Sequence, residues 1–183
     1  MSKAVVFLAD GTEECEALLV VDLLRRAGVN TVTASAMGRT EVTTSHGILL
    51  QADALAETVD YSDADLLVLP GGVPGTPNLA ANAAVITAGK AQYAAGKKLA
   101  AICAAPSILG SLGMLDGKRA TAHAAFQNRL GGATVLDEEV VVDGTITTSY
   151  GLGGALPFAL ELVRQLAGAA EAEAIRSAIA YRH

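Results

Sequence analysis

The chain has 183 residues, of which 51% are hydrophobic, and its formal net charge is −6. This length and apolar content suffice for one sizeable core and leave little room for a second, so we expect a single domain over residues 1–183. The composition excludes a disordered or fibrous chain. The acidic balance and the absence of any Lys/Arg run argue against nucleic acid or an anionic membrane as the main partner.

Targeting features and cysteine content indicate a cytoplasmic protein without a metal site. No apolar segment approaches the ~20 residues that span a bilayer, and the N-terminal apolar run is too short for a signal peptide because it ends at Asp10. Cytosolic thiols stay reduced, and the two cysteines have no paired histidines at zinc-binding spacing. We therefore predict neither membrane association nor a bound metal.

Short apolar runs of β type alternate along the chain with amphipathic or apolar helices. In chain order, the pattern predicts a strand at 4–9, a helix at 14–27, a strand at 31–34, a hairpin of 42–44 with 48–51, a strand at 66–69, a helix at 83–95, a strand at 99–102, a helix at 104–112, a strand at 119–122, a hairpin of 140–142 with 145–148, and helices at 155–167 and 171–180. The runs at 66–69 and 99–102 are apolar on both faces, as central parallel strands are. The alternation predicts an α/β fold with a mostly parallel central sheet and helices on both faces.

The helix expected at 14–27 is apolar around most of its circumference. A surface helix has a polar half, so this helix must pack on two sides. A homodimer interface through this first helix accounts for the second apolar side, and we expect a homodimer.

The unusual residues of the sequence follow the predicted strands. An acidic stretch at 10–16 follows the first strand, Pro70-Gly71-Gly72 follows the strand at 66–69, Cys103 follows the strand at 99–102, and His123 follows the strand at 119–122. Ligands of open α/β sheets bind beyond the carboxyl ends of the strands. An acid, a glycine pair, a thiol and an imidazole at one rim therefore predict the functional site.

Cys103 is the centre of this predicted site. It must turn at once from a buried strand into a helix, and its small neighbours Ala104 and Ala105 suit a nucleophile elbow. A helix N-terminus stabilises a thiolate, so we expect the pKa of Cys103 to fall from ~8.5 into the range of ~3.5–7.5. A buried cysteine with a structural role is the alternative. Cys15 lies between acids that repel a thiolate, and we assign it no reaction.

The neighbouring groups each have a functional and a structural interpretation. Gly71 and Gly72 either direct amide N–H groups at a developing negative charge or form a plain tight turn. His123 is either a proton relay or a structural histidine. Glu16 either complements the helix dipole or turns toward Cys103, where burial would raise its pKa and keep it protonated.

Three segments carry a family resemblance. They are the run from Leu8 to Glu16, the run Val68-Leu69-Pro70-Gly71-Gly72, and the run Ala100-Ala101-Ile102-Cys103-Ala104-Ala105-Pro106. Together, and in this order, they resemble the ThiJ/PfpI superfamily, with the branch of the Parkinson-disease-associated protein deglycase as the closest. The resemblance covers almost the whole chain and extends to 22–28 and 148–151.

The resemblance implies a flavodoxin-like three-layer sandwich, as in class I glutamine amidotransferases, and usually a homodimer. It implies that Cys103 is the reactive cysteine, that Glu16 is the protonated acid in contact with it, and that His123 is the nearby histidine. The backbone N–H groups of Gly72 and Ala104 would form an oxyanion hole. Ala104 stands where the protease-like branch has a histidine, and His123 lacks the His-x-Glu pattern of the amidotransferases, so neither of those activities is expected.

The activities that the resemblance implies need no cofactor. They are glutathione-independent conversion of methylglyoxal, a small reactive carbonyl, to lactate, and repair of glycated protein or nucleotide. The alternative is an oxidative-stress sensor or chaperone in which Cys103 is oxidised to sulfinic acid with little turnover. Isonitrile hydration, an activity of other members of the superfamily, is a third alternative, and no residue of this sequence specifically indicates it. Ser45-His46 replaces a Ser-Arg segment that lines an anion-binding spot in the closest branch, which weakens the expectation that a charged group binds there.

Overall fold

The computed structural model describes residues 2–182. Its elements in chain order are β1 (Lys3–Leu8), α1 (Glu14–Arg26), β2 (Asn30–Ser35), β3 (Glu41–Thr43), β4 (Leu49–Gln51), β5 (Ala54–Leu55), the 3-10 helix η1 (Ala56–Thr58), β6 (Leu66–Leu69), α2 (Gly75–Ala81), α3 (Ala83–Ala94), β7 (Lys98–Ile102), α4 (Pro106–Ser111), β8 (Arg119–Ala120), the 3-10 helix η2 (Ala124–Arg129), β9 (Thr134–Val135), β10 (Val140–Asp143), β11 (Ile146–Ser149), the 3-10 helix η3 (Leu152–Gly154), α5 (Ala155–Ala167) and α6 (Ala169–Ala178). Each predicted element is present within two residues of its expected bounds. None of the helices in this part of the chain is both long enough and apolar enough to cross a membrane.

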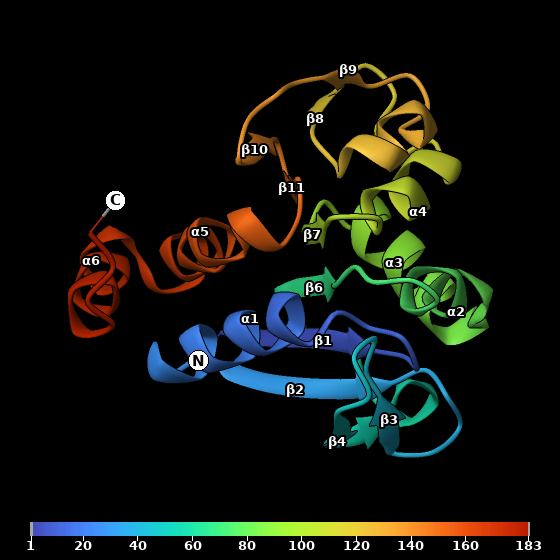
Figure 1. Cartoon of the computed structure of the whole chain (residues 1–183), viewed down its shortest axis with the longest axis horizontal. Coiled ribbons are helices and arrows are strands. Elements are labelled where there is room, and N and C mark those ends of the chain that lie inside the picture. Colours follow the sequence, from blue (N-terminus) through green and yellow to red (C-terminus); the bar gives the residue numbers. More distant parts are fainter. Residues whose placement is uncertain (1, 183) are drawn as a thin grey trace.

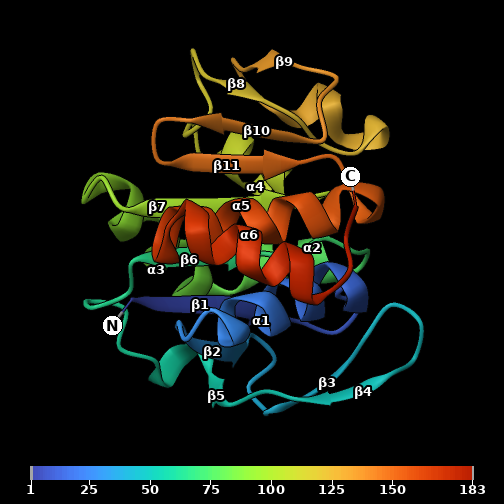
Figure 2. The ribbon, with the colours of Figure 1, turned by 90° about the vertical axis from the view of Figure 1, so that its left-hand side faces the viewer.

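Within the described residues, seven strands form one sheet in the order β10-β11-β7-β6-β1-β2-β5 (Figures 1 and 2). Neighbouring strands are parallel except for the edge pair β10 and β11, which confirms the mostly parallel sheet. In the central register, Val6 of β1 lies beside Val68 of β6, which lies beside Ala100 of β7. The carboxyl ends of these strands therefore meet at one edge of the sheet, where the site is expected.

Alternate residues of the central strands face opposite helical layers. Val5 and Phe7 of β1 belong to a core that includes residues of α2, α3 and α4, whereas Ala4 and Val6 belong to a core with α1 and α5. Figure 2 shows α1, α5 and α6 in front of the sheet and α3 and α4 behind it. The three-layer, flavodoxin-like α/β sandwich that the family resemblance implies is confirmed.

The strand expected at 119–122 differs from its prediction. β8 ends at Ala120 and pairs in parallel with β9 in a separate two-stranded sheet. The Thr121 N–H donates to the side chain of Thr148 (3.0 Å) instead of to a backbone carbonyl, so the chain leaves the ladder there. His123 nevertheless lies beside the end of β7, since its N–H donates to the carbonyl of Cys103 (3.0 Å).

Two helices near the rim also differ from the prediction. α2 (Gly75–Ala81) was not expected, because its sequence contains Gly, Pro, Thr and Asn, which are poor helix formers. Tertiary packing overrides that preference: Leu79 is fully buried. The helix expected at 104–112 begins only at Pro106, where the missing N–H of proline costs nothing. Both differences lie directly after strands that end at the site.

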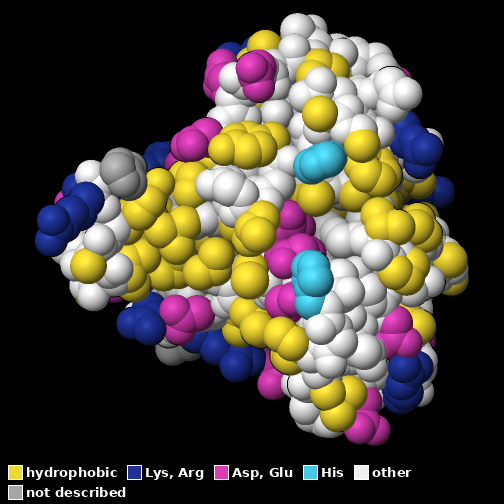
Figure 3. Space-filling model, in the orientation of Figure 1, with side chains coloured by type: hydrophobic (Ala, Val, Ile, Leu, Met, Phe, Trp, Pro, Cys, Tyr) yellow, Lys and Arg dark blue, Asp and Glu magenta, His cyan; other side chains and the backbone are white. Residues whose placement is uncertain are grey.

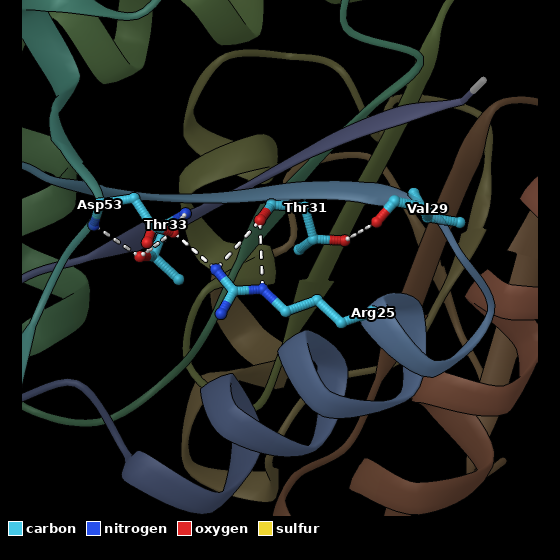
Figure 4. A network of polar contacts seen from close by, with 5 residues as sticks. All are labelled: Arg25, Val29, Thr31, Thr33 and Asp53. Atoms are coloured by element: carbon cyan, nitrogen blue, oxygen red, sulfur yellow. Dashed lines mark hydrogen bonds and ion pairs between the residues drawn. The ribbon is translucent and has the colours of Figure 1, made fainter.

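A polar network fixes the C-terminal end of α1 against β2 (Figure 4). Arg25 donates to the carbonyl of Thr31 (3.1 Å) and to Asp53 (2.7 Å). Asp53 also accepts hydrogen bonds from the Thr33 N–H (2.8 Å) and hydroxyl (2.8 Å). Burial acts to raise the pKa of Asp53, but the hydrogen bonds from Thr33 and the Arg25 guanidinium outweigh it and lower the pKa. The network therefore holds an ionised carboxylate and helps to set the position of α1.

Gly89 lies inside α3 and offers a test of local stability. A Cβ at this position would meet no heavy atom within 4 Å, and the backbone is helical. We expect Gly89→Ala to raise the free energy of unfolding by about 0.5–1 kcal/mol, because alanine favours the helix and restricts the unfolded chain. Urea unfolding measures the change.

Gly28→Ala is the matched control for this variant. A Cβ on Gly28 also meets nothing within 4 Å, but the φ of +70° strains an L side chain. This variant should lose about 1 kcal/mol. Equal effects of the two substitutions would contradict the argument from backbone conformation.

Candidate functional site

Cys103 occupies the sharp turn between β7 and α4, as the sequence predicts. Its φ of 65° is a left-handed conformation that is uncommon for a residue with a side chain. Two hydrogen bonds hold the turn: the Cys103 N–H donates to the carbonyl of Ser149 (2.9 Å), and the Cys103 carbonyl accepts from the N–H of His123 (3.0 Å). The half-buried thiol is therefore presented in the manner of a nucleophile elbow.

Glu16 comes from the first turn of α1 and points inward. The residue is only 1% exposed. Its N–H donates to the side chain of Glu13 (2.7 Å), which caps the helix. Its Oε2 accepts from the N–H of Gly71 (3.0 Å), and its carboxyl group is hydrogen-bonded to Cys103. The inward alternative for Glu16 is therefore the observed one.

The environment of Glu16 favours its neutral form. Burial raises the pKa of Glu16 to about 7, with the hydrogen bond from Cys103 opposing the shift and the charge of Glu13 adding to it. This direction agrees with the prediction from the sequence. Near neutral pH the carboxyl group can both hold and release a proton.

The prediction of a lowered pKa for Cys103 is wrong. Burial, the negative charge of Glu16 and the hydrogen bond to Glu16 raise the pKa of Cys103 to about 12. The amides of Gly72 and Ala104 hydrogen-bond to the sulfur and act in the other direction, but they do not outweigh these effects. The helix contributes little because it begins only at Pro106 and is short. Above about pH 7 the thiol and the carboxyl group therefore share a single proton.

The predicted backbone donors surround this pair and have different partners. The N–H groups of Gly72 and Ala104 reach the sulfur, whereas the N–H of Gly71 is engaged by Glu16. Gly71 thus positions the acid. A Cβ on Gly71 would lie 2.5 Å from the Cβ of Cys103 and 2.5 Å from Oε2 of Glu16. Only glycine allows the thiol and the carboxyl group to approach each other here.

His123, Cys103 and Glu16 converge on Gly151. A Cβ on Gly151 would lie 3.7 Å from Cδ2 of His123, 3.9 Å from the sulfur and 3.9 Å from Oε1 of Glu16. Nδ1 of the exposed His123 accepts from the N–H of Ala125 (3.3 Å), so the neutral ring carries its proton on Nε2. In the sequence, Gly151 appears only as the last residue of the run 148–151 in the family resemblance. A Cβ at these distances would make ordinary van der Waals contacts, so glycine is favoured here by the φ of +149°, which strains an L side chain.

His46 lies near the acidic start of α1. Its Nδ1 contacts Oε1 of Glu14 (2.8 Å), and the hydroxyl of Ser45 donates to Oε2 of the same carboxylate (3.1 Å). Figure 3 shows two histidine side chains on either side of a group of acidic side chains on this face of the molecule. The residue for which the resemblance left an anion-binding spot in doubt is thus in contact with a carboxylate.

One group of side chains in the described part of the chain has the geometry of a cation site. Ligand atoms of Glu13, Glu14 and His46 lie within 4.8 Å of one another. Glu13 already caps α1 at the N–H of Glu16, and Glu14 already binds Ser45 and His46. We therefore assign no metal to this group.

The fold and the site define a flavodoxin-like protein with a cysteine elbow and a buried acid. The DJ-1/PfpI family model matches residues 2–165. Protein DJ-1 homolog A of Arabidopsis thaliana is 38% identical over 178 residues, which are 96% of this chain and 45% of that protein. Deglycase TK1284 of Thermococcus kodakarensis is 34% identical over 167 residues, which are 90% of this chain and 99% of that protein.

A solved structure supports the same assignment. Oxidized DJ-1 of Toxoplasma gondii superposes with a TM-score of 0.96 at 34% identity, with 100% of both chains covered. The chain belongs to the DJ-1/PfpI family, as the resemblance in its sequence indicates. It spans less than half the length of the two Arabidopsis relatives, 45% and 42%.

Proposed function

We propose that this protein is a cysteine-dependent, cofactor-free glyoxalase or deglycase. The observation that carries the proposal is the buried Glu16 carboxyl group, which shares a proton with Cys103 while two amide N–H groups face the sulfur. The relative from Thermococcus kodakarensis named a deglycase supports the same class of reaction. The substrates would be 2-oxoaldehydes such as methylglyoxal, or glycated adducts.

In the first step, the sulfur of Cys103 attacks the aldehyde carbon and a C–S bond forms. The thiol proton passes to the carboxylate of Glu16, which compensates for the high pKa of the thiol. The electron pair of the C=O bond moves to oxygen, where the N–H groups of Gly72 and Ala104 stabilise the negative charge. Protonation of this oxygen gives a hemithioacetal.

In the second step, Glu16 and His123 move a proton from the first carbon to the second. Loss of the proton from the first carbon leaves its electron pair in an enediol, and protonation of the second carbon yields a thioester of Cys103. Water then hydrolyses the thioester, which restores the thiol and releases a 2-hydroxy acid. One carbon is oxidised while its neighbour is reduced, so the reaction balances without an external oxidant or reductant.

The test uses protein freed of metal and glutathione. Incubation with methylglyoxal should release lactate in excess over the protein concentration. Lactate that does not exceed the rate in buffer alone contradicts the proposed function.

An oxidative-stress sensor is the second candidate, and the site favours it for one reason. The carboxyl group of Glu16 lies against the sulfur and could hydrogen-bond to a sulfinate formed by peroxide. The Toxoplasma gondii relative is described in an oxidized form. Mass spectrometry after mild peroxide treatment separates the candidates: gain of two oxygen atoms on Cys103, together with negligible lactate formation, favours the sensor.

We also propose that the protein is a homodimer that pairs through α1. Leu18 on this helix is 41% exposed, although the chain buries most other apolar residues of α1. Light scattering should give twice the chain mass of 18.5 kDa. Leu18→Glu should shift the dimer toward monomer, because a charge would lose water at the interface. A monomeric wild-type protein contradicts this expectation.

A further inference from the structure

A groove lies between α2, α4 and η2, the helices that follow Gly72, Ala104 and His123 in the chain, and it plays no part in the chemistry described above. This open groove has a volume of about 330 Å³. Its apolar lining comes from Pro77 and Ala80 of α2, Ile108 of α4 and Phe126 of η2. Its polar or charged lining comes from Thr76 of α2, Ser107 and Ser111 of α4, and Arg129 of η2.

Each wall of the groove is hydrogen-bonded to a residue of the site. The Thr76 N–H donates to the carbonyl of Gly72 (2.8 Å), and the Ser107 N–H donates to the carbonyl of Ala104 (3.1 Å). The third wall follows the same pattern, because the N–H of Phe126 donates to the carbonyl of His123 (2.7 Å). Each wall of the groove therefore begins within four residues of a residue of the site.

The polar groups of the groove have unused hydrogen-bonding capacity. Thr76 is 4% exposed, and its hydroxyl has no partner. The hydroxyls of Ser107 and Ser111 donate to the carbonyls of Ala104 (2.6 Å) and Ile108 (2.8 Å) in their own helix. A buried hydroxyl without a partner costs stability, so the orphaned Thr76 group indicates that a ligand oxygen completes it.

Arg129 supplies an uncompensated positive charge. Its guanidinium lies 5.3 Å from the centre of the Phe126 ring. Among the residues that the structure describes, no carboxylate pairs with it, whereas other arginines have acidic partners: Arg25, Arg26, Arg39, Arg119, Arg164 and Arg176. A guanidinium held on an aromatic ring keeps its planar donors available for a carboxylate.

We propose that this groove binds the carboxylate-bearing tail of the carbonyl substrate, with Arg129 as the group that recognises the charge. The inference rests on the proposed function and narrows its substrate class to 2-oxoaldehydes whose short apolar chain ends in a carboxylate. The chain would lie along Ile108 and Phe126, and its carboxylate would accept hydrogen bonds from Arg129 and the Thr76 hydroxyl.

The test compares two substrates of equal chain length, 4,5-dioxopentanoate and the uncharged 2-oxopentanal. In wild-type protein, kcat/KM should be higher for the charged substrate. Arg129→Gln should lower the ratio of the two kcat/KM values about tenfold, because a hydrogen-bonded charge is lost. Arg164→Gln is the matched control, since it removes the same charge from an exposed position on α5 and should leave the ratio at the wild-type value.

A binding measurement separates this inference from the proposed reaction. The unreactive 4-oxopentanoate should bind wild-type protein in an NMR titration and shift groove resonances, and Arg129→Gln should weaken its binding about tenfold. If neither aldehyde is converted but 4-oxopentanoate binds through Arg129, the reaction is wrong and the groove assignment stands. If both aldehydes are converted with a ratio that Arg129→Gln does not change, and 4-oxopentanoate shifts no groove resonance, the groove assignment is overturned.

Discussion

Replacing Cys103 by alanine is expected to reduce lactate formation from methylglyoxal by at least about 1,000-fold, because the proposed reaction proceeds through a covalent bond to this sulfur. The second cysteine, Cys15, does not replace it. Cys15 is exposed at the surface, and its partial loss of water together with the charges of Glu13, Glu14 and Glu16 raises its pKa. The measurement is the initial rate of lactate release by the purified variant at neutral pH.

Cys15→Ala is the matched control for this variant. It removes a thiol that is next to Glu16 in the sequence but outside the reacting pair, so the rate should stay within about twofold of wild type. The Cys103→Ala protein should keep its secondary structure, because the two hydrogen bonds of the turn are made by the backbone. A folded Cys103→Ala protein with the wild-type rate would show that the thiol is not the nucleophile.

The central strands could be predicted from the sequence because the residues of each strand are themselves apolar. The strands β6 (Leu66–Leu69) and β7 (Lys98–Ile102) consist mostly of buried apolar residues, and both lie at the centre of the sheet. The rule that parallel strands present ligand sites at their carboxyl ends then places Cys103 and Gly71 at one rim. Both belong to the observed site.

The proton chemistry could not be predicted in the same way, because it depends on contacts across the fold. A helix start next to Cys103 suggested a stabilised thiolate, whereas the structure places a buried carboxyl group against the sulfur, which raises the pKa of the thiol. The role of Gly151 was missed for the same reason. Nothing in its neighbouring sequence indicates that the side chains of His123, Cys103 and Glu16 meet around it.

The pH dependence of the reaction should follow Glu16. Because its carboxylate must be free to accept the thiol proton, kcat/KM for methylglyoxal should rise about tenfold per pH unit below about pH 7 and level off above it.

The free energy of unfolding should instead fall as the pH rises through this range. The raised pKa means that the folded state holds this proton more tightly than the unfolded chain, where the ordinary value is 4.5. The stabilisation, about 3 kcal/mol, is therefore complete below about pH 4.5 and is lost as the pH rises through about 7.

Glu16→Gln should separate these effects in a single variant. A glutamine oxygen can still accept the hydrogen bond of the Gly71 N–H, but the side chain has no proton to exchange, so lactate formation should fall about 100- to 10,000-fold and lose its inflection near pH 7. Removal of the negative charge should lower the pKa of Cys103, so iodoacetamide should alkylate this thiol faster than in wild type. Urea unfolding between about pH 5 and pH 8 should show that the variant gains stability relative to wild type as the pH rises, by up to about 3 kcal/mol. Faster alkylation together with slower turnover would mean that Glu16 moves protons during the reaction, whereas wild-type turnover in this variant would remove Glu16 from the mechanism.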